Sequence, residues 1–335
     1  APLVKKYRER LGKDASEAVV VTYAMIEAMD TGLARVFQTL KDEGLWEKTL
    51  IVFTSDNGPV LRRDPELGSQ MRFNGVFSGE KESVLEGGIR VPGIVAWPGH
   101  IPGGRVVATP VHGCDWLPTL FSLTGRSAPA GAKPFDGLNL MPLLEGKPAP
   151  ALADRPLLFQ RNRYAPVGHV NAAIREGRWK LYWPGDKASL VKDSGRDNPS
   201  YRRGLVLPHW EMPLDGELAA PSSAPQPAPR LFDLEADPGE QRDLAATHPE
   251  VVAALARKHD AWFGEVLAEW IESRARIVVD DRAAWQGRPV PDAAKLFKEF
   301  WQWNSAPKGM DPKSADPLKV FPGYWSTRGA NRKSQ

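Results

Sequence analysis

The stretch that decides the fold class reads TLIVFTSDNG over residues 49–58 and continues, after a loop, as SGEKESVLEGGIRVPGIVAWPG over residues 78–99. Its apolar, β-branched start predicts a buried strand over Thr49–Thr54. That strand runs into Asp56 and Asn57, so a carboxylate and an amide stand where the strand gives way to a turn. In open α/β sheets, ligands bind outside the carboxyl ends of strands. Because calcium and magnesium prefer oxygen ligands, both residues are candidate metal ligands.

A plain turn is the alternative interpretation of Asp-Asn-Gly, in which Gly58 would provide a positive φ. The tripeptide alone favours that interpretation. Its combination with the residues that follow is more specific. Lys81 comes next, then Glu86, and Gly87-Gly88 lead as a glycine-rich turn into a second apolar strand over residues 91–97.

The order of these motifs resembles the sulfatase family of the alkaline-phosphatase-like superfamily. Members typically show a TSDNG-like segment, then G-x-K, then EGG-x-R-x-P. Later segments are also similar, so the resemblance covers roughly residues 18–275. These segments are CDWLPTLFSLTG (114–125), DGLNLMPLLEG (136–146), AAIREGRWKLYW (172–183) and LFDLEADPGEQRDL (231–244).

The expected fold class is α/β: a mainly parallel sheet sandwiched by helices, followed by a smaller C-terminal antiparallel α+β subdomain. Alternating helix and strand patterns in the first part of the chain favour the parallel sheet. Residues 1–150 are predicted to form the C-terminal part of the catalytic sulfatase domain. Residues 151–275 are predicted as the small subdomain with a long loop at 185–230, and 276–335 as a Trp- and Pro-rich tail.

Two helices are predicted from their start signals. Asp14 and Glu17 form one such signal, and Gly44 marks the end of that helix. Its apolar residues repeat every three to four positions, which predicts a single packed face. The second helix follows a capping box at 247–250 and is expected to pack on the small sheet. The apolar face of the first helix comprises Val19, Tyr23, Ile26, Leu33, Val36, Phe37 and Leu40.

The resemblance implies hydrolysis of sulfate esters, of the arylsulfatase or glycan sulfatase type. It implies a divalent metal, Ca²⁺ with Mg²⁺ as an alternative, held by Asp56 and Asn57. It also implies that Lys81 is catalytic, as a fixed positive donor aimed at the sulfate or the leaving oxygen. The structural alternative for Lys81 is a surface lysine paired with Glu80 or Glu82.

The resemblance also implies a sulfated small molecule or a sulfated glycan as the partner. Basic residues on loops could border the pocket and suit such anions, whereas solvated surface charge is the alternative for each of them. The candidate substrate-binding residues are Arg62, Arg63, Arg161, Arg163 and His169.

The family nucleophile is a formylglycine made from Cys or Ser in a C/S-x-P-S-R motif, which these 335 residues do not contain. The one cysteine, Cys114, is followed by Asp-Trp-Leu-Pro. The chain is therefore expected to be the C-terminal part of a longer sulfatase and to be inactive alone. Two alternatives remain: a phosphodiesterase or phosphonate monoester hydrolase of the same superfamily, and a non-catalytic fragment that binds sulfated ligand without turnover.

Charge and hydropathy exclude some functional classes. The chain has 44 basic and 41 acidic residues, for a net charge of +3. This balance does not indicate nucleic-acid binding, and no apolar run is long enough to predict a membrane span. The resemblance implies a periplasmic or secreted location, and the sequence does not indicate an oligomeric state.

Overall fold

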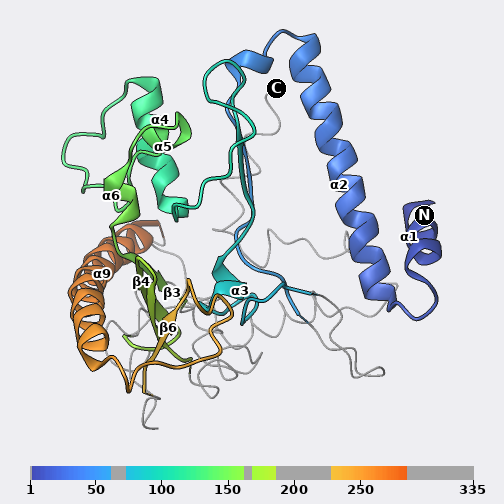
Figure 1. Cartoon of the computed structure of the whole chain (residues 1–335). Helices are drawn as coiled ribbons and strands as arrows, with labels where there is room; N and C mark the ends of the chain where they lie inside the picture. The colour runs from blue at the N-terminus through green and yellow to red at the C-terminus, as the bar shows by residue number, and fades with distance from the viewer. Residues whose placement is uncertain (1, 62–72, 162–167, 186–227, 285–335) are drawn as a thin grey trace. The chain divides into compact units, whose positions relative to one another are not determined.

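The computed structural model describes residues 2–61, 73–161, 168–185 and 228–284 (Figure 1). The chain divides into two compact units, one comprising 1–161, 171–184 and 228–259, the other 162–170, 185–227 and 260–335. The first unit contains α1 (Pro2–Leu11), α2 (Glu17–Asp42), η1 (Trp46–Lys48), β1 (Ile51–Thr54), α3 (Glu86–Ile89), β2 (Gly93–Ala96), η2 (Gly113–Asp115), α4 (Trp116–Thr124), α5 (Met141–Leu144), α6 (Pro150–Ala153), β3 (Leu157–Gln160), β4 (Ala172–Glu176), β5 (Trp179–Trp183), β6 (Arg230–Asp233) and the start of α9 (Pro249–Ala284).

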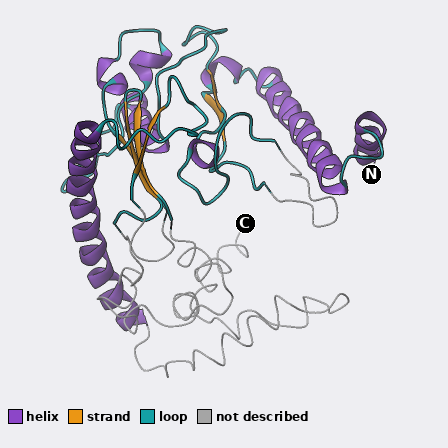
Figure 2. Cartoon of the chain, turned by 60° about the horizontal axis from the view of Figure 1, so that its bottom comes forward, coloured by secondary structure: helices purple, strands orange, loops and turns teal. Residues whose placement is uncertain are grey.

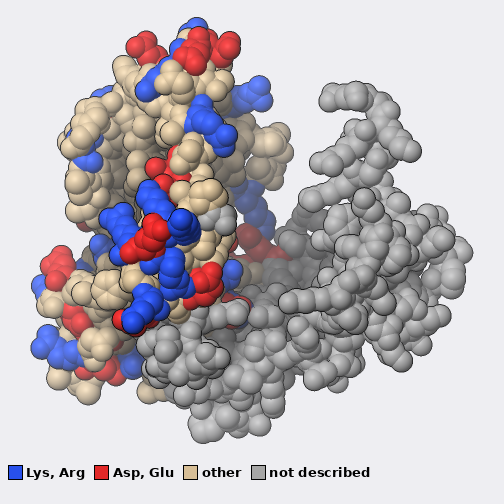
Figure 3. Space-filling model, turned by 90° about the vertical axis from the view of Figure 1, so that its right-hand side faces the viewer, with Lys and Arg blue, Asp and Glu red and all other residues tan. Residues whose placement is uncertain are grey.

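The predicted domain boundaries at residues 150 and 275 stay predictions. The predicted loop at 185–230 and the tail at 276–335 lie mostly outside the described residues. None of the described helices is both long and apolar enough to span a membrane. On the face drawn in Figure 3, basic and acidic side chains lie beside one another, as the near balance of charge leads one to expect.

Strands β1 and β2 form a two-stranded antiparallel sheet, with Ile51 opposite Ala96 and Thr54 opposite Gly93. The mainly parallel sheet is therefore not confirmed, because both sheets within the described ranges are antiparallel. Parallel neighbours need a crossover, usually a helix. The described part of the β1–β2 connection contains only the four-residue helix α3. The prediction that Thr49–Thr54 is buried was also wrong, since no residue of β1 is buried.

The second sheet has the strand order β3-β4-β5-β6 and is antiparallel throughout, which confirms the prediction for this part of the chain. Figure 2 shows its strands as a group distinct from β1 and β2. The register places Ile174 opposite Leu181, which in turn lies opposite Leu231. Because side chains alternate across a strand, β4, β5 and β6 each contribute buried residues to both faces of the sheet.

Both faces of this four-stranded sheet are covered. On one face, Ile174 and Leu181 pack with Leu255 and Val251 of α9, as predicted for the second helix. On the other face, Ala173, Tyr182 and Phe232 pack with Val84, Leu85 and Ile89, which lie in and just before α3. The segment that resembles the family's EGG-x-R-x-P motif therefore rests on the small sheet.

Helix α2 begins and ends close to the predicted positions. Its N-cap is Ser16, whose Oγ accepts a hydrogen bond from the Val19 N–H, rather than Asp14. Gly44 follows the helix with φ +62°, a conformation that glycine adopts without strain. The prediction of a single packed face was wrong: only Val20 and Ala24 are buried. Ile26 and Val36 are exposed, because α1 covers only part of the helix, and Tyr23 stays 48% exposed although it stacks on Tyr7 of α1.

A buried carboxylate, Asp115, organises the segment from η2 to α6. It accepts hydrogen bonds from the backbone N–H groups of His112 and Leu138, at 2.7 and 2.9 Å, and from both terminal nitrogens of Arg155. Burial raises the pKa of Asp115, but these hydrogen bonds outweigh it and hold the pKa below its usual value. The family-like motif D-x-x-P-T therefore has a structural role in this chain.

We expect Asp115→Asn to reduce the free energy of unfolding by about 1.5–3 kcal/mol at neutral pH, the range for hydrogen bonds to a charged group. A depressed carboxyl pKa stabilises the fold above the unfolded pKa, near 3.9, and this contribution is lost as pH falls through the folded pKa. The difference between wild type and variant should therefore shrink on acidification. Urea denaturation at several pH values measures it. Asp136→Asn, at an exposed neighbouring carboxylate, is the control, and an equal effect of both variants would contradict the prediction.

Candidate functional site

The loop after β1 and the loop before α3 are joined by backbone hydrogen bonds. The Gly58 N–H donates to the Gly88 carbonyl at 2.8 Å, and the Lys81 N–H donates to the Pro59 carbonyl at 2.8 Å. The Leu61 N–H adds a third link by donating to the Glu80 carboxylate. The structure therefore holds the segment that carries Asp56 and Asn57 beside the segment that carries Lys81.

Glycine is needed at this junction for space. A Cβ on Gly58 would lie 1.9 Å from the Gly87 carbonyl oxygen, and one on Gly88 would lie 2.0 Å from the Ser83 carbonyl oxygen. Gly58 does not have a positive φ, so it does not serve as the positive-φ residue that a plain Asp-Asn-Gly turn would need. Gly87 and Gly88 belong to α3 and not to a turn. A side chain at position 58 would force the two loops apart, whereas one at position 88 would displace the segment just before α3.

The two candidate metal ligands differ in exposure. Asp56 is exposed, and the only contact to its carboxylate among the described residues is with the Ser55 hydroxyl at 3.5 Å. Asn57 is half-buried, and its amide nitrogen donates to the Gly58 carbonyl at 3.1 Å. This hydrogen bond leaves the Asn57 side-chain oxygen available as an acceptor.

Lys81 is exposed, and its ammonium group has no ion pair within the described parts of the chain. The two partners expected for a plain surface lysine are engaged elsewhere. Glu80 accepts from the Leu61 N–H, and Glu82 pairs with Arg161 at 2.7 Å. The structure therefore does not show the pairing that a purely structural Lys81 would have.

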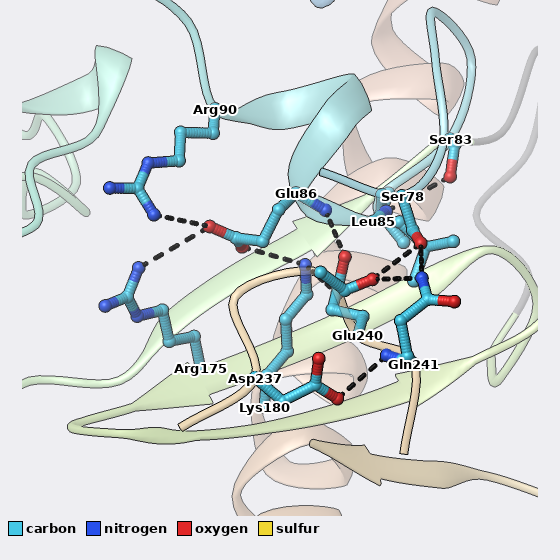
Figure 4. A network of polar contacts seen from close by, with 12 residues as sticks. Ser78, Ser83, Leu85, Glu86, Arg90, Arg175, Lys180, Asp237, Glu240 and Gln241 are labelled. Carbon is cyan, nitrogen blue, oxygen red and sulfur yellow. Dashed lines mark hydrogen bonds and ion pairs between the residues drawn. The ribbon is translucent and has the colours of Figure 1, made fainter. Parts of the chain in front are cut away.

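A buried ionic cluster lies where α3 meets the small sheet (Figure 4). It comprises Glu86, Lys180 and Glu240. Lys180 of β5 lies 3.0 Å from Glu86 Oε1 and 2.8 Å from Glu240 Oε1, and the Glu86 N–H donates to Glu240 Oε2 at 2.7 Å. Arg90 and Arg175 approach Glu86 from the other side, at 3.7 and 3.8 Å. This arrangement ties α3 to the small sheet and to the turn after β6.

Burial raises the pKa of Glu240, while the neighbouring Lys180 acts in the opposite direction. The turn that carries Glu240 is itself fixed to the loop before α3. The Ser78 hydroxyl donates to the Gly239 carbonyl at 2.6 Å, and the Gln241 side chain donates to the Ser78 hydroxyl at 2.7 Å. The family-like D-P-x-E segment therefore holds α3 and the loop before it in place.

Two asparagines also shape the site loops, and the sequence analysis missed both. Asn171 donates to the Glu82 carbonyl at 2.8 Å and so holds that residue at φ +78°, an uncommon value for a residue other than glycine. Asn74 donates to the carbonyls of Gly79 and Gly87, at 3.2 and 3.0 Å. No local motif marks either residue, because Asn171 acts on a carbonyl 89 positions away and one of the two Asn74 bonds spans 13 positions.

The structure describes two of the five predicted substrate-binding residues. Arg62, Arg63 and Arg163 lie outside the described residues. Arg161 is placed beside the Lys81 loop by its ion pair with Glu82. His169 belongs to the second compact unit, where its Nε2 lies 2.6 Å from Asp260 Oδ1. Their contact with a substrate stays a prediction, as does convergence of the Asp56, Asn57 and Lys81 side chains on one metal and one sulfate.

Asp56 and Asn57 offer the oxygen ligands that a hard divalent cation prefers, but two residues are too few to complete its coordination. Asp56 offers a carboxylate without a cationic partner in the described residues, and Asn57 offers a neutral oxygen. Calcium takes six to eight oxygen ligands. These two residues would therefore hold the ion only together with further ligands.

Comparison with known proteins gives a consistent result. Residues 2–126 match the family model described as Sulfatase. Steryl-sulfatase of Mus musculus is 36% identical over 251 residues, which are 70% of this chain and 36% of the relative. Arylsulfatase D of Homo sapiens is 34% identical over 239 residues, which are 69% of this chain and 37% of the relative. The chain thus spans little more than a third of these relatives.

Solved structures share the fold. The crystal structure of Ps i-CgsB in complex with k-i-k-neocarrahexaose matches with a TM-score of 0.57 and 21% identity, over 91% of this chain and 51% of that chain. The crystal structure of Ps i-CgsB matches with a TM-score of 0.55 and 23% identity, over 77% and 46%. On the family model and these relatives together, the chain belongs to the sulfatase family.

Proposed function

We propose that this chain contributes metal ligands and a cationic donor to a site that hydrolyses sulfate esters of small molecules or glycans. The observation that carries the proposal is the joined pair of loops, which presents an exposed carboxylate at Asp56 and an exposed ammonium at Lys81. The buried charges of the neighbouring structure, Glu86, Glu240 and Asp115, all have partners. Asp56 and Lys81 have no oppositely charged partner among the described residues, as groups that receive a ligand would.

The chemistry assigns a role to each residue. Hydrolysis of a sulfate ester places negative charge on the leaving oxygen and the sulfate oxygens. Bound calcium, or magnesium in its place, would stabilise that charge as a Lewis acid. Asp56 would neutralise part of the charge of the cation, and Asn57 would add a neutral oxygen. Lys81 would donate to a sulfate oxygen or to the leaving oxygen, which lowers the barrier electrostatically.

The proposal needs a nucleophile that these 335 residues do not contain, since no C/S-x-P-S-R motif occurs in them. The chain spans 36% and 37% of two sulfatase relatives, so a formylglycine on another sulfatase segment is the proposed source. A phosphodiester or a phosphonate monoester would place similar charge on its oxygens, and the same residues would serve it. The substrate assay therefore includes both classes of ester.

The test uses these 335 residues joined to a sulfatase segment that carries the C/S-x-P-S-R motif, expressed with the formylglycine-generating machinery. We expect Lys81→Ala to reduce kcat for an aryl sulfate by about a hundredfold, because one preorganised electrostatic donor is lost. Lys81→Arg should retain more activity than Lys81→Ala, because it keeps the charge. Steady-state kinetics with an aryl sulfate measure both variants.

Controls separate a catalytic role of Lys81 from a general effect of removing a lysine. Lys48→Ala, at an exposed lysine of η1, should leave kcat unchanged. The 335-residue chain by itself should show no turnover. Faster hydrolysis of a phosphonate or phosphodiester than of the sulfate would favour the alternative activity. Turnover by the short chain that a chelator does not affect would contradict the proposal.

A further inference from the structure

Lys81 lies in a tight turn whose third residue has an uncommon backbone conformation. The turn is closed by the Ser83 N–H, which donates to the Glu80 carbonyl at 2.9 Å. Lys81 and Glu82 are its central residues. Glu82 has a φ of +78°, which is the value that a type II turn requires at its third residue. Glycine usually occupies this position, because a side chain makes a positive φ unfavourable. The turn therefore needs support from residues outside it.

The type of turn determines where the Lys81 ammonium points. Type I and type II turns differ by a rotation of the peptide plane between the central residues, here the plane that joins Lys81 to Glu82. A type I turn would give Glu82 the negative φ that residues with side chains prefer, and would retain the hydrogen bond that closes the turn. The rotation also changes the ψ of Lys81, which tilts its Cα–Cβ bond and displaces the ammonium. Without outside support, the turn would therefore favour the form that moves Lys81.

The buried amide of Asn171 provides this support. Its Nδ2 donates to the Glu82 carbonyl at 2.8 Å, and its Oδ1 accepts from the Val84 N–H at 3.4 Å. Only 2% of Asn171 is exposed, so water competes little for either hydrogen bond. On its N-terminal side, Lys81 donates its own N–H to the Pro59 carbonyl at 2.8 Å. The backbone is therefore held on both sides of the Lys81 side chain.

The small sheet holds Asn171 in place. Asn171 directly precedes β4, and the Arg161 N–H, directly after β3, donates to the Asn171 carbonyl at 3.1 Å. The Asn171 Nδ2 also donates to the Arg161 carbonyl, at 3.4 Å. Asn171 has a φ of +44°, and asparagine adopts a positive φ more readily than most residues. Both the backbone and the side chain of this position therefore suit asparagine.

A second contact to Glu82 lies on the exposed side of the turn. Arg161 Nη2 lies 2.7 Å from Glu82 Oε1, with 24% and 46% of the two side chains exposed. Ion pairs this exposed contribute little. This pair also holds the Glu82 side chain and not its backbone, so it does not by itself select the type of turn. The contacts of Asn171 do so.

We propose that Asn171 is a positioning residue for Lys81: it holds the turn over residues 80–83 in the type II form and so fixes the direction of the Lys81 ammonium. The inference rests on the function proposed above, because only a catalytic Lys81 needs a fixed direction. Asn171 itself has no contact with substrate in this proposal, since its side chain is buried. Loss of its amide should therefore lower kcat and leave KM nearly unchanged.

The kinetic test uses the 335 residues joined to the segment that carries the nucleophile motif. Asn171→Asp keeps the oxygen that accepts from Val84 and a side chain compatible with a positive φ, but it removes the donor to Glu82. We expect kcat for an aryl sulfate to fall by about tenfold and KM to stay within about twofold, because a displaced donor weakens the transition state and not binding. Adding Glu82→Gly should restore most of the lost kcat, because glycine adopts a φ of +78° without support.

Two further variants separate positioning from a general loss of stability. Asn139→Asp is the matched control, because Asn139 also accepts from a backbone N–H, at 2.9 Å, and donates to a side chain, at 3.0 Å, between α4 and α5. It should leave kcat unchanged. In a Lys81→Ala background, Asn171→Asp should change kcat by no more than about twofold, since its effect acts through the ammonium.

A measurement on the 335-residue chain alone tests the turn without catalysis. The ψ of Lys81 sets the distance from its Hα to the Glu82 N–H, so the nuclear Overhauser effect between these hydrogens is strong in a type II turn and weak in a type I turn. It should be strong in the wild type and lost in Asn171→Asp. If Asn171→Asp does not fold, Asn171→Gly is the second variant, since glycine keeps the positive φ and removes only the side chain.

Several results would overturn the proposal. An Overhauser effect that persists in Asn171→Asp or Asn171→Gly would show that the turn does not depend on the amide. Equal losses of kcat in Asn171→Asp and Asn139→Asp would show a general effect. A full further loss in the Lys81→Ala background would show that Asn171 does not act through Lys81. An undiminished kcat in Lys81→Ala, with an Overhauser effect that still depends on Asn171, would instead overturn the proposed function and leave the hold on the turn supported.

Discussion

Replacing Asp56 by alanine should abolish sulfate ester hydrolysis in the complete site, with a fall in kcat of at least about a thousandfold. The variant removes the one charged metal ligand that this chain is proposed to supply. Lewis-acid stabilisation by a metal is worth several kcal/mol, and each 1.36 kcal/mol corresponds to a factor of ten in rate. Turnover of an aryl sulfate, measured across a calcium titration, gives the size of the effect.

Two control variants make the Asp56 result interpretable. Asp56→Asn keeps an oxygen ligand but loses the charge, so it should retain more activity than Asp56→Ala at high calcium. Asp30→Ala, at an exposed aspartate of α2, should behave as wild type. If Asp56→Ala keeps kcat within tenfold of wild type at every calcium concentration, Asp56 is not a metal ligand and the proposed function loses its central residue.

Replacing Lys180 by methionine should reduce the free energy of unfolding by about 3–5 kcal/mol. The Lys180 side chain is fully buried, and its removal would leave Glu86 and Glu240 facing each other without the ammonium between them. Removing one partner of a buried ion pair has an effect of this size, because an uncompensated charge stays out of water. Urea denaturation of the 335-residue chain measures it, with far-ultraviolet circular dichroism as the signal.

The chain offers a matched control for the Lys180 variant. Lys258 pairs with Glu176 at 2.5 Å, but both side chains are partly exposed. Lys258→Met should therefore change stability by less than about 1 kcal/mol. Adding Glu240→Gln to Lys180→Met should restore part of the lost stability, because one of the two facing carboxylates is removed. Equal effects of Lys180→Met and Lys258→Met would show that the buried cluster contributes little.

Sequence patterns predicted the helices and strands whose formation depends mainly on residues close to one another in the chain. Short runs of strand-forming residues predicted an antiparallel sheet in the small subdomain, and the capping box at 247–250 predicted the start of α9. The helical period predicted α2, whose capping residue differs from the prediction by two positions. The family resemblance implied that Asp56, Asn57 and Lys81 belong to one site. Backbone hydrogen bonds join the segments that carry them, while convergence of the three side chains stays a prediction.

Features that depend on distant partners were not predictable. An apolar run over Ile51–Thr54 indicates a strand suited to burial, yet burial depends on which layers cover it, and none does so here among the described residues. The pairing of Lys180 with Glu240 joins residues on different elements, so no periodicity or spacing reveals it. Glycine at position 58 fits many turns, whereas its actual constraint is the carbonyl of Gly87 across the junction.

The long sequence separation within the buried ionic cluster affects when the site can form during synthesis. The hydrogen bond from the Glu86 N–H to Glu240 joins residues 154 positions apart. Since domains form as the chain emerges from the ribosome, at about 5–20 residues per second, α3 must wait for Glu240 to emerge before its final contacts can form. Until then Lys180 and Glu86 have each other but not Glu240. A nascent chain that stops before residue 240 would thus contain every residue of the candidate site and still lack the support that fixes the loop carrying Lys81.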